Sequence, residues 1–114
     1  MLRDDSFHLR HMLEAAQVSQ SFAQGRVRAD LDNDLIFFYA LVKVVEIIGE
    51  AASHVTRGFQ ASHPKIEWEV IIGMRNRLVH TYYDISRDVV WEAVQDGVPI
   101  LIPQLEEFLR EQTC

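Results

Sequence analysis

The sequence has one cysteine, three prolines and no long apolar run. Its single thiol, Cys114, excludes a disulfide within the chain, which favours a reducing compartment such as the cytoplasm. The longest apolar run, residues 35–42, is far shorter than the ~20 residues of a membrane-spanning helix, so we expect no membrane span. Residues 1–6 include acidic side chains and no apolar stretch, so we expect no secretory signal.

Positive charge is also scarce, because 11 Lys and Arg stand against 17 Asp and Glu, for a formal net charge of −6. Such a chain is not expected to bind nucleic acid or anionic membranes over its whole surface. The charge is uneven along the chain. Residues 1–53 carry a net −3 and residues 84–114 a net −5, whereas residues 54–83 carry a net +2. Any contact with nucleic acid is therefore expected in this central basic segment.

What the sequence does have is an apolar pattern with the period of helices. With 48% apolar and 25% charged residues, a chain of 114 residues fits one globular domain over residues 1–114. No strand alternation and no internal repeat is visible. We therefore predict an all-α fold, a bundle of four to five helices. The expected helices cover about residues 5–24, 31–55, 64–79, 86–94 and 100–111.

Glycine, proline and serine mark the expected ends and irregularities of these helices. Gly25 is expected to end the first helix, and Ser86 to cap the start of the fourth. Residues 57–64 are expected to form a loop, with Pro64 in the first turn of the third helix. Glycine inside a helix costs about 1 kcal/mol relative to alanine, so Gly73 predicts a close packing approach. Gly97 and Pro99 are expected to break or kink the chain before the last helix.

The second expected helix, residues 31–55, leaves little polar face in its middle. Acidic residues stand at its start, where caps and the helix dipole favour negative charge: Asp30, Asp32 and Asp34. A helix that is apolar nearly all round is buried on several sides. We expect this one to form either the centre of the bundle or part of a subunit interface.

The chemistry-bearing residues gather at residues 75–83, RNRLVHTYY. The guanidinium of Arg75 presents a planar fork that matches two phosphate oxygens. The imidazole of His80 is suited to giving and taking protons near neutral pH, and Asn76 can orient either group by hydrogen bonding. These three are the candidate catalytic residues, and they suit cleavage of a phosphodiester without a metal.

The spacing within this motif limits how one chain can use it. Asn76, His80 and Tyr83 share a helix face, whereas Arg75 and His80 lie about 140° apart around a helix. They point in different directions unless the helix ends near His80 or a second chain supplies the partner. A symmetric dimer would bring two such sets into one cleft. Alternatively, the Arg and His simply stabilise the negative end of the helix and the tyrosines pack.

Residues 75–82, RNRLVHTY, resemble the R-N-x-x-x-H-x-Y signature of the HEPN superfamily, specifically its HepT-like branch. Residues 47–52, IIGEAA, resemble that branch's I-G-E-A stretch. The resemblance extends over roughly residues 30–112. The flanking matches are Trp68 and residues 71–74 before the motif, and residues 84–85 and 90–91 after it.

The resemblance implies a homodimeric, metal-independent ribonuclease toxin that needs no cofactor and has its active cleft at the dimer interface. It implies that Arg75 and His80 are catalytic, with Asn76 as their polar companion. It further implies an antitoxin, a minimal nucleotidyltransferase that silences the toxin by transferring AMP to Tyr82. A different reading is a non-catalytic dimeric HEPN module that partners a nucleotidyltransferase or binds nucleotides.

Three further residues are candidates for supporting roles: Glu50, Arg77 and Tyr83. We expect Glu50 to hold an arginine of the cleft or a helix cap. Alternatively, Glu46 and Glu50 form a solvated pair, since no Glu-x-x-His partner accompanies them as in a carboxylate metal site.

The histidines and tryptophans outside the motif have plainer readings. His8 and His11 are more typical of a surface pair than of a metal site. His54 and His63 flank the expected loop and could contact RNA. Both tryptophans, Trp68 and Trp91, are expected in the core.

Overall fold

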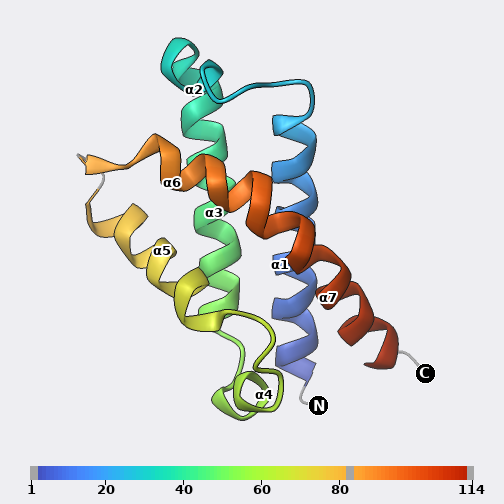
Figure 1. Cartoon of the computed structure of the whole chain (residues 1–114). Coiled ribbons are helices and arrows are strands. Elements are labelled where there is room, and N and C mark those ends of the chain that lie inside the picture. Colours follow the sequence, from blue (N-terminus) through green and yellow to red (C-terminus); the bar gives the residue numbers. More distant parts are fainter. Residues whose placement is uncertain (1–2, 82–83, 113–114) are drawn as a thin grey trace.

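The computed structural model describes residues 3–81 and 84–112, and within these ranges the chain is all-α, as predicted (Figure 1). Four long helices form the bundle: α1 (Arg3–Ala23), α3 (Leu35–Ser53), α5 (Trp68–His80) and α7 (Val98–Gln112). Three short helices join them: α2 (Asp30–Asn33), α4 (Arg57–Ser62) and α6 (Arg87–Glu92). No helix in the described ranges is long and apolar enough to cross a membrane.

Helix α3 is the centre of the bundle, because α1 packs along one side of it and α5 along another (Figure 1). Helix α7 lies diagonally across α1. One apolar cluster joins α1, α3, α5 and α7, and a second joins the N-terminal half of α3 to α2 and α6. Trp68 is buried in the first cluster, so the prediction that it belongs to the core is confirmed, whereas Trp91 is half-buried and packs against the second.

The single helix predicted over residues 31–55 is wrong, because the chain bends at Asp34. This residue is extended, with φ −128° and ψ 97°, so α2 ends before it and α3 begins after it. The Asp34 carboxylate accepts a hydrogen bond of 3.1 Å from the backbone N–H of Phe37, and one of 2.8 Å from Arg26 Nη2. An acidic cap at the start of the long helix was expected, and Asp34 provides it.

The loop predicted over residues 57–64 is also wrong, because residues Arg57–Ser62 form α4. Thr56 caps this helix by accepting a hydrogen bond from Phe59 N. The same threonine donates through its backbone N–H (2.8 Å) and its Oγ1 (2.7 Å) to Asp5, a buried carboxylate on α1. The cap and the carboxylate together fix α4 to the start of α1. Pro64 lies outside the third long helix, which begins at Trp68.

Gly97 and Pro99 do not break the chain before the last helix, so of the predicted break or kink only a local irregularity is found. Helix α6 runs through a π turn, Ala93–Gly97, directly into α7. Pro99 comes just after the π turn and lacks the N–H that a continuous helix would use at this position. A π turn widens the helix without ending it, so the local irregularity is absorbed. The prediction that Ser86 caps this region is confirmed, since its side chain accepts from Val89 N.

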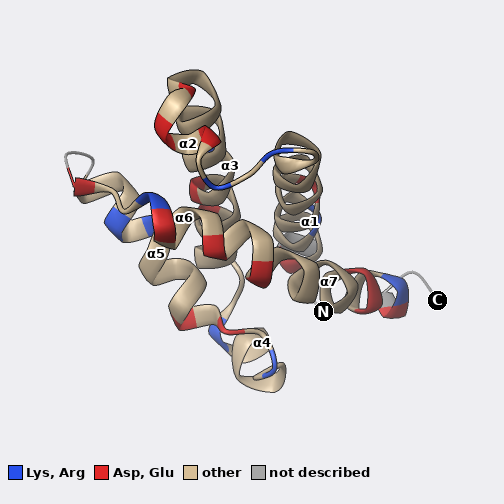
Figure 2. Cartoon of the chain, turned by 45° about the horizontal axis from the view of Figure 1, so that its top comes forward, with Lys and Arg blue, Asp and Glu red and all other residues tan. Residues whose placement is uncertain are grey.

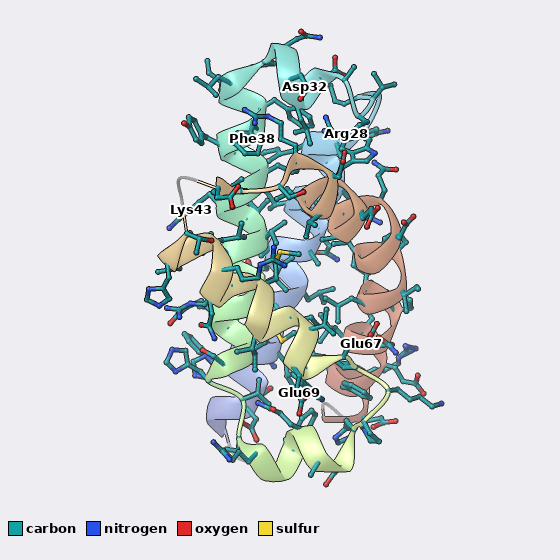
Figure 3. The ribbon with its side chains drawn as sticks, turned by 60° about the vertical axis from the view of Figure 1, so that its left-hand side comes forward. Arg28, Asp32, Phe38, Lys43, Glu67 and Glu69 are labelled. Carbon is teal, nitrogen blue, oxygen red and sulfur yellow. The ribbon has the colours of Figure 1, made fainter. Side chains whose placement is uncertain are left out.

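Ion pairs tie the short helices at one end of the bundle together. Arg28 contacts Asp32 on α2 at 3.1 Å and Asp88 on α6 at 2.6 Å (Figure 3 labels the Arg28–Asp32 pair). Arg87 donates to the carbonyl oxygen of Leu31 at 3.1 Å and lies over the ring of Phe38. These contacts place α6 against α2 and α3.

The close approach predicted at Gly73 is found at Gly49 instead. A Cβ at position 73 would meet nothing within 4 Å. A Cβ at position 49 would overlap the Cβ of Arg75 and lie 2.9 Å from the carbonyl oxygen of Ile71. Glycine on α3 therefore lets the backbone of α5 come close at the turn that carries the candidate arginine.

Candidate active site

Helix α5 carries the candidate residues on its C-terminal half. The helix ends at His80, where the backbone N–H and Oγ1 of Thr81 both donate to the carbonyl oxygen of Arg77. Leu78 is buried and holds this end of the helix against α3. The face shared by Asn76 and His80 therefore lies on the last turns of α5. Tyr82 and Tyr83 lie outside the described residues.

Arg75 points toward α3 rather than into solvent. Its Nη2 lies 2.6 Å from Glu50 Oε2, and its Nη1 donates to Asn76 Oδ1 at 2.9 Å. The side chain is 27% exposed. The arginine contact expected of Glu50 is thus present, and Asn76 holds the same guanidinium from α5 itself.

The Nε–H of Arg75 is buried and has no hydrogen-bond partner among the described residues. An unpaired buried donor costs about 1–3 kcal/mol, and native structures contain few of them. Stability alone would favour an apolar side chain at this position. The placement of Arg75 is better explained by a need for its guanidinium at the surface between α3 and α5.

Glu50 bridges two basic side chains. Its Oε2 contacts Arg75, and its Oε1 lies 3.0 Å from Nε2 of His54, one turn later on α3. The hydrogen bond from His54, followed by the positive charge of Arg75, holds the pKa of Glu50 below its ordinary value. The carboxylate is therefore ionised at neutral pH, as its two partners require.

His80 and Arg77 are exposed, and no described residue forms an ion pair or hydrogen bond with either side chain. His80 lies about 140° around α5 from Arg75, which faces α3. The structure thus agrees with the spacing argument that one chain does not turn both residues the same way. Figure 2 shows the basic residues of α5 toward its C-terminal end, next to the acidic start of α6.

The other candidates are placed as follows. Glu46 contacts Lys43 at 3.4 Å, so it does not pair with Glu50 (Figure 3 labels Lys43). His63 stacks on Phe59 and its Nδ1 lies 2.9 Å from the carbonyl oxygen of that residue, which makes it part of the packing of α4. Within the described ranges no group of three or more histidine, cysteine or acidic side chains is arranged to hold a metal ion, and this includes His8 and His11.

The role of His54 beside Glu50 was not identified from the sequence. A signal was present, because Glu50 and His54 are four residues apart and therefore meet on one helix face. The contact with His8 was not visible in this way. The two imidazole rings are stacked with centroids 5.0 Å apart, but they come from α1 and α3.

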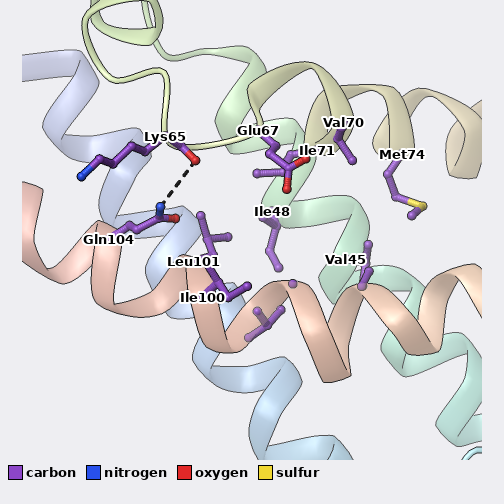
Figure 4. Close-up of a pocket in the computed structure, with 13 residues that line it drawn as sticks. Val45, Ile48, Lys65, Glu67, Val70, Ile71, Met74, Ile100, Leu101 and Gln104 are labelled. Carbon is purple, nitrogen blue, oxygen red and sulfur yellow. Dashed lines mark hydrogen bonds between the residues drawn. The ribbon is translucent and has the colours of Figure 1, made fainter.

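A cavity of about 150 Å³ lies between α3, α5 and α7, away from this cluster (Figure 4). Its walls are mostly aliphatic, with Val45, Ile71 and Leu101 among them. The polar contact at its edge is a 3.5 Å hydrogen bond from Gln104 Nε2 to the carbonyl oxygen of Lys65. Lys65 and Glu67 also line the cavity, but Arg75, Asn76, His80 and Glu50 do not, so the candidate site is the α3–α5 cluster.

Comparisons with known proteins show what the whole chain is similar to. The family model described as ribonuclease HepT-like matches residues 12–111. A protein named as a candidate RNase from Caldanaerobacter subterraneus subsp. tengcongensis is 30% identical over 105 residues, which cover 92% of this chain and 94% of that protein. One named as a probable ribonuclease HepT from Thermococcus cleftensis is 29% identical over 108 residues, which cover 95% and 98%. No solved structure is significantly similar.

Proposed function

This chain belongs to the ribonuclease HepT-like family, and on that premise we propose that it is a ribonuclease in which Arg75 and His80 act on RNA. The observation that carries the proposal is the setting of Arg75. Glu50 and Asn76 hold its guanidinium in place, while further N–H groups of the fork stay available for phosphate oxygens. His80 stands on the same helix with an exposed imidazole.

The reaction follows from these two groups. An imidazole of His80 takes the proton from a ribose 2′-hydroxyl, and the 2′-oxygen attacks the neighbouring phosphorus. A new 2′-O–P bond forms as the P–O5′ bond breaks, and the 5′-oxygen leaves with a proton from an imidazolium. Arg75 stabilises the negative charge that develops on the phosphoryl oxygens. The products are a 2′,3′-cyclic phosphate and a 5′-hydroxyl, and no metal is required for these steps.

We place the reaction in a cleft between two copies of the chain. Arg75 faces α3 and His80 faces outward, so the two residues of one chain do not point the same way. A second copy of the chain would contribute its own Arg75 and His80 to the same cleft. Apolar side chains are exposed on α3, the helix that also carries Glu50, with Ile36 at 83% and Tyr39 at 59%. Covering such residues favours association of two chains.

We further propose that the chain is the toxin of a toxin–antitoxin pair. Its partner would be a minimal nucleotidyltransferase that attaches AMP to Tyr82. The resemblance of the motif supports this pairing, since the tyrosine lies two residues after His80. A phosphate-linked nucleotide there adds negative charge next to the motif, which would repel RNA.

Cleavage of RNA by the purified chain in excess EDTA tests the ribonuclease assignment. His80→Ala is expected to lower kcat by about 10²–10⁴-fold, and Arg75→Ala by about 10²–10³-fold. His11→Ala, an exposed histidine on α1, is the matched control and should cleave like the wild type. Loss of cleavage in EDTA, or full activity of His80→Ala, would contradict this mechanism.

Expression of the chain with and without a minimal nucleotidyltransferase tests the pairing. Growth arrest that the partner relieves supports the toxin, and intact mass should then show added AMP that is lost on Tyr82→Phe. The absence of both arrest and cleavage, together with a stable complex, would favour the non-catalytic module. AMP that remains on the Tyr82→Phe chain would exclude that tyrosine as the acceptor.

A further inference from the structure

A line of contacts runs from the candidate arginine to the first helix of the bundle. Nη2 of Arg75 lies 2.6 Å from one oxygen of Glu50, and the other oxygen lies 3.0 Å from Nε2 of His54. The ring of His54 stacks on that of His8, with centroids 5.0 Å apart and planes 25° from parallel. Three helices, α5, α3 and α1, therefore contribute to one connected cluster.

The chemistry of this cluster fixes the direction of the hydrogen bond. An ionised carboxylate only accepts, so Nε2 of His54 carries a hydrogen and donates it to Glu50. Without this bond, the Glu50 side chain, which is 46% exposed, would be held from one side only, by Arg75. A long exposed side chain with one partner retains much of its rotamer freedom.

The imidazole of His8 stacks on that of His54, the ring that carries the donor N–H, and so restricts its position. His54 is the C-cap residue that follows α3, where the chain turns toward α4, and its side chain is 55% exposed. His8 comes from α1 and covers one face of the ring. The donor is therefore supported from a second helix, and the orientation of the Glu50 carboxylate follows from it.

We propose that His54 is a positioning residue for RNA cleavage, which orients Glu50 and through it the guanidinium of Arg75. The proposal rests on the ribonuclease function proposed above. It assigns to His54 no contact with RNA. Its effect is on the transition state, because Arg75 acts on charge that develops during the reaction.

Two substitutions separate the donor from the ring. His54→Gln keeps an N–H donor at the end of the side chain and removes the ring. His54→Phe keeps a ring that stacks on His8 and removes the donor. We expect His54→Phe to lower kcat by about 10–100-fold with little change in KM, because misplacing a catalytic group by about 1 Å costs rate on this scale. His54→Gln should restore most of kcat.

His63→Phe is the matched control. Its imidazole is also at the end of a helix, stacked on an aromatic ring and bonded to an oxygen, but that oxygen belongs to the backbone of Phe59. It should leave kcat unchanged. In a Glu50→Gln background, His54→Phe should add little further loss, since both changes act on one path.

A second readout does not require activity. The side-chain NMR signals of Arg75 should shift in His54→Phe and stay near their wild-type positions in His54→Gln. If no variant cleaves RNA, the ribonuclease function fails while this readout still tests the cluster. Equal kcat in His54→Phe and the wild type, equal loss in both His54 variants, or unshifted Arg75 signals in His54→Phe would overturn the proposal.

Discussion

At the scale of single residues, Gly49 decides whether Arg75 can lie where it does. Any side chain at position 49 would collide with Arg75 and the backbone of Ile71, and backbone has little room to move. The glycine of the IGEA stretch is therefore explained by the distance between α3 and α5. Because α3 and α5 lie this close together, the adjacent Glu50 contacts Arg75.

We expect Gly49→Ala to destabilise the fold by about 1–3 kcal/mol, because it overpacks the contact between α3 and α5. Gly73→Ala is the control. Position 73 has open space, so the substitution should stabilise α5 by about 0.5–1 kcal/mol. Urea unfolding of both variants measures the difference. Equal effects of the two substitutions would show that α3 and α5 are not in close contact at Gly49.

Glu50 makes the stability of the fold depend on pH, and we expect stability to decrease as the pH falls. Its pKa in the folded chain is lowered from 4.5, chiefly by the hydrogen bond from His54. A lowered pKa contributes stability above the ordinary value, and this contribution disappears as the pH falls through the folded value. We therefore expect stability to fall below about pH 4.5 in the wild type, and to fall less in Glu50→Gln. Urea unfolding between about pH 6 and pH 3 measures the free energy of unfolding of both chains. An equal loss of stability with falling pH in the wild type and in Glu50→Gln would contradict the prediction.

At the scale of elements, α4 shows how a cap can outweigh loop-like composition. A glycine and a serine in residues 57–62 suggest a loop, but Thr56 supplies the first turn with an acceptor. The same side chain bonds Asp5, which is 2% exposed. One residue therefore determines both the helix and its attachment to α1.

We expect Thr56→Ala to destabilise the fold by about 2 kcal/mol, from the lost cap and the lost bond to a buried carboxylate. Ser62→Ala removes another hydroxyl of the same helix, one that is exposed and bonds only Gly58 O, and should have little effect. Thermal unfolding compares the two. A similar change in Tm for both variants would show that the Thr56 contacts contribute nothing particular.

At the scale of the whole molecule, the positive charge that could attract RNA is local. The chain carries −6 overall, and several of its arginines are already paired with aspartates around α2 and α6. Arg77 is exposed and has no ion pair among the described residues. RNA affinity is therefore expected to be modest and confined to the surface around the end of α5.

Mixing two inactive variants tests the proposed shared cleft. Arg75→Ala and His80→Ala chains, each inactive, should regain activity when mixed and allowed to exchange. In a mixed dimer, one of the two clefts then contains the intact Arg75 of one chain and the intact His80 of the other. Random pairing gives about a quarter of wild-type activity, since half of the dimers carry one of two working sites. RNA cleavage measures this, and no recovery after confirmed exchange would place both residues in one chain's site.

The sequence by itself determined the all-α class, the capping role of Ser86 and the place of Trp68 in the core. These features follow from local periodicity and from bonds between residues a few positions apart. It also determined which residues could do chemistry and that Arg75 and His80 point apart, because a helix sets that angle. The contact between Glu50 and Arg75 was one of the expectations from the sequence, though a solvated pair with Glu46 was left open.

Only the tertiary structure decided which glycine brings α3 and α5 together, and that His8 supports His54. These contacts join residues far apart in the sequence, so no local pattern carries them. Packing likewise overrode composition at α4 and at the π turn before α7, because a buried carboxylate and continued apolar contact stabilise helix where glycine and proline disfavour it. The motif identifies the candidate residues, and the packing of α1, α3 and α5 holds Arg75 among them.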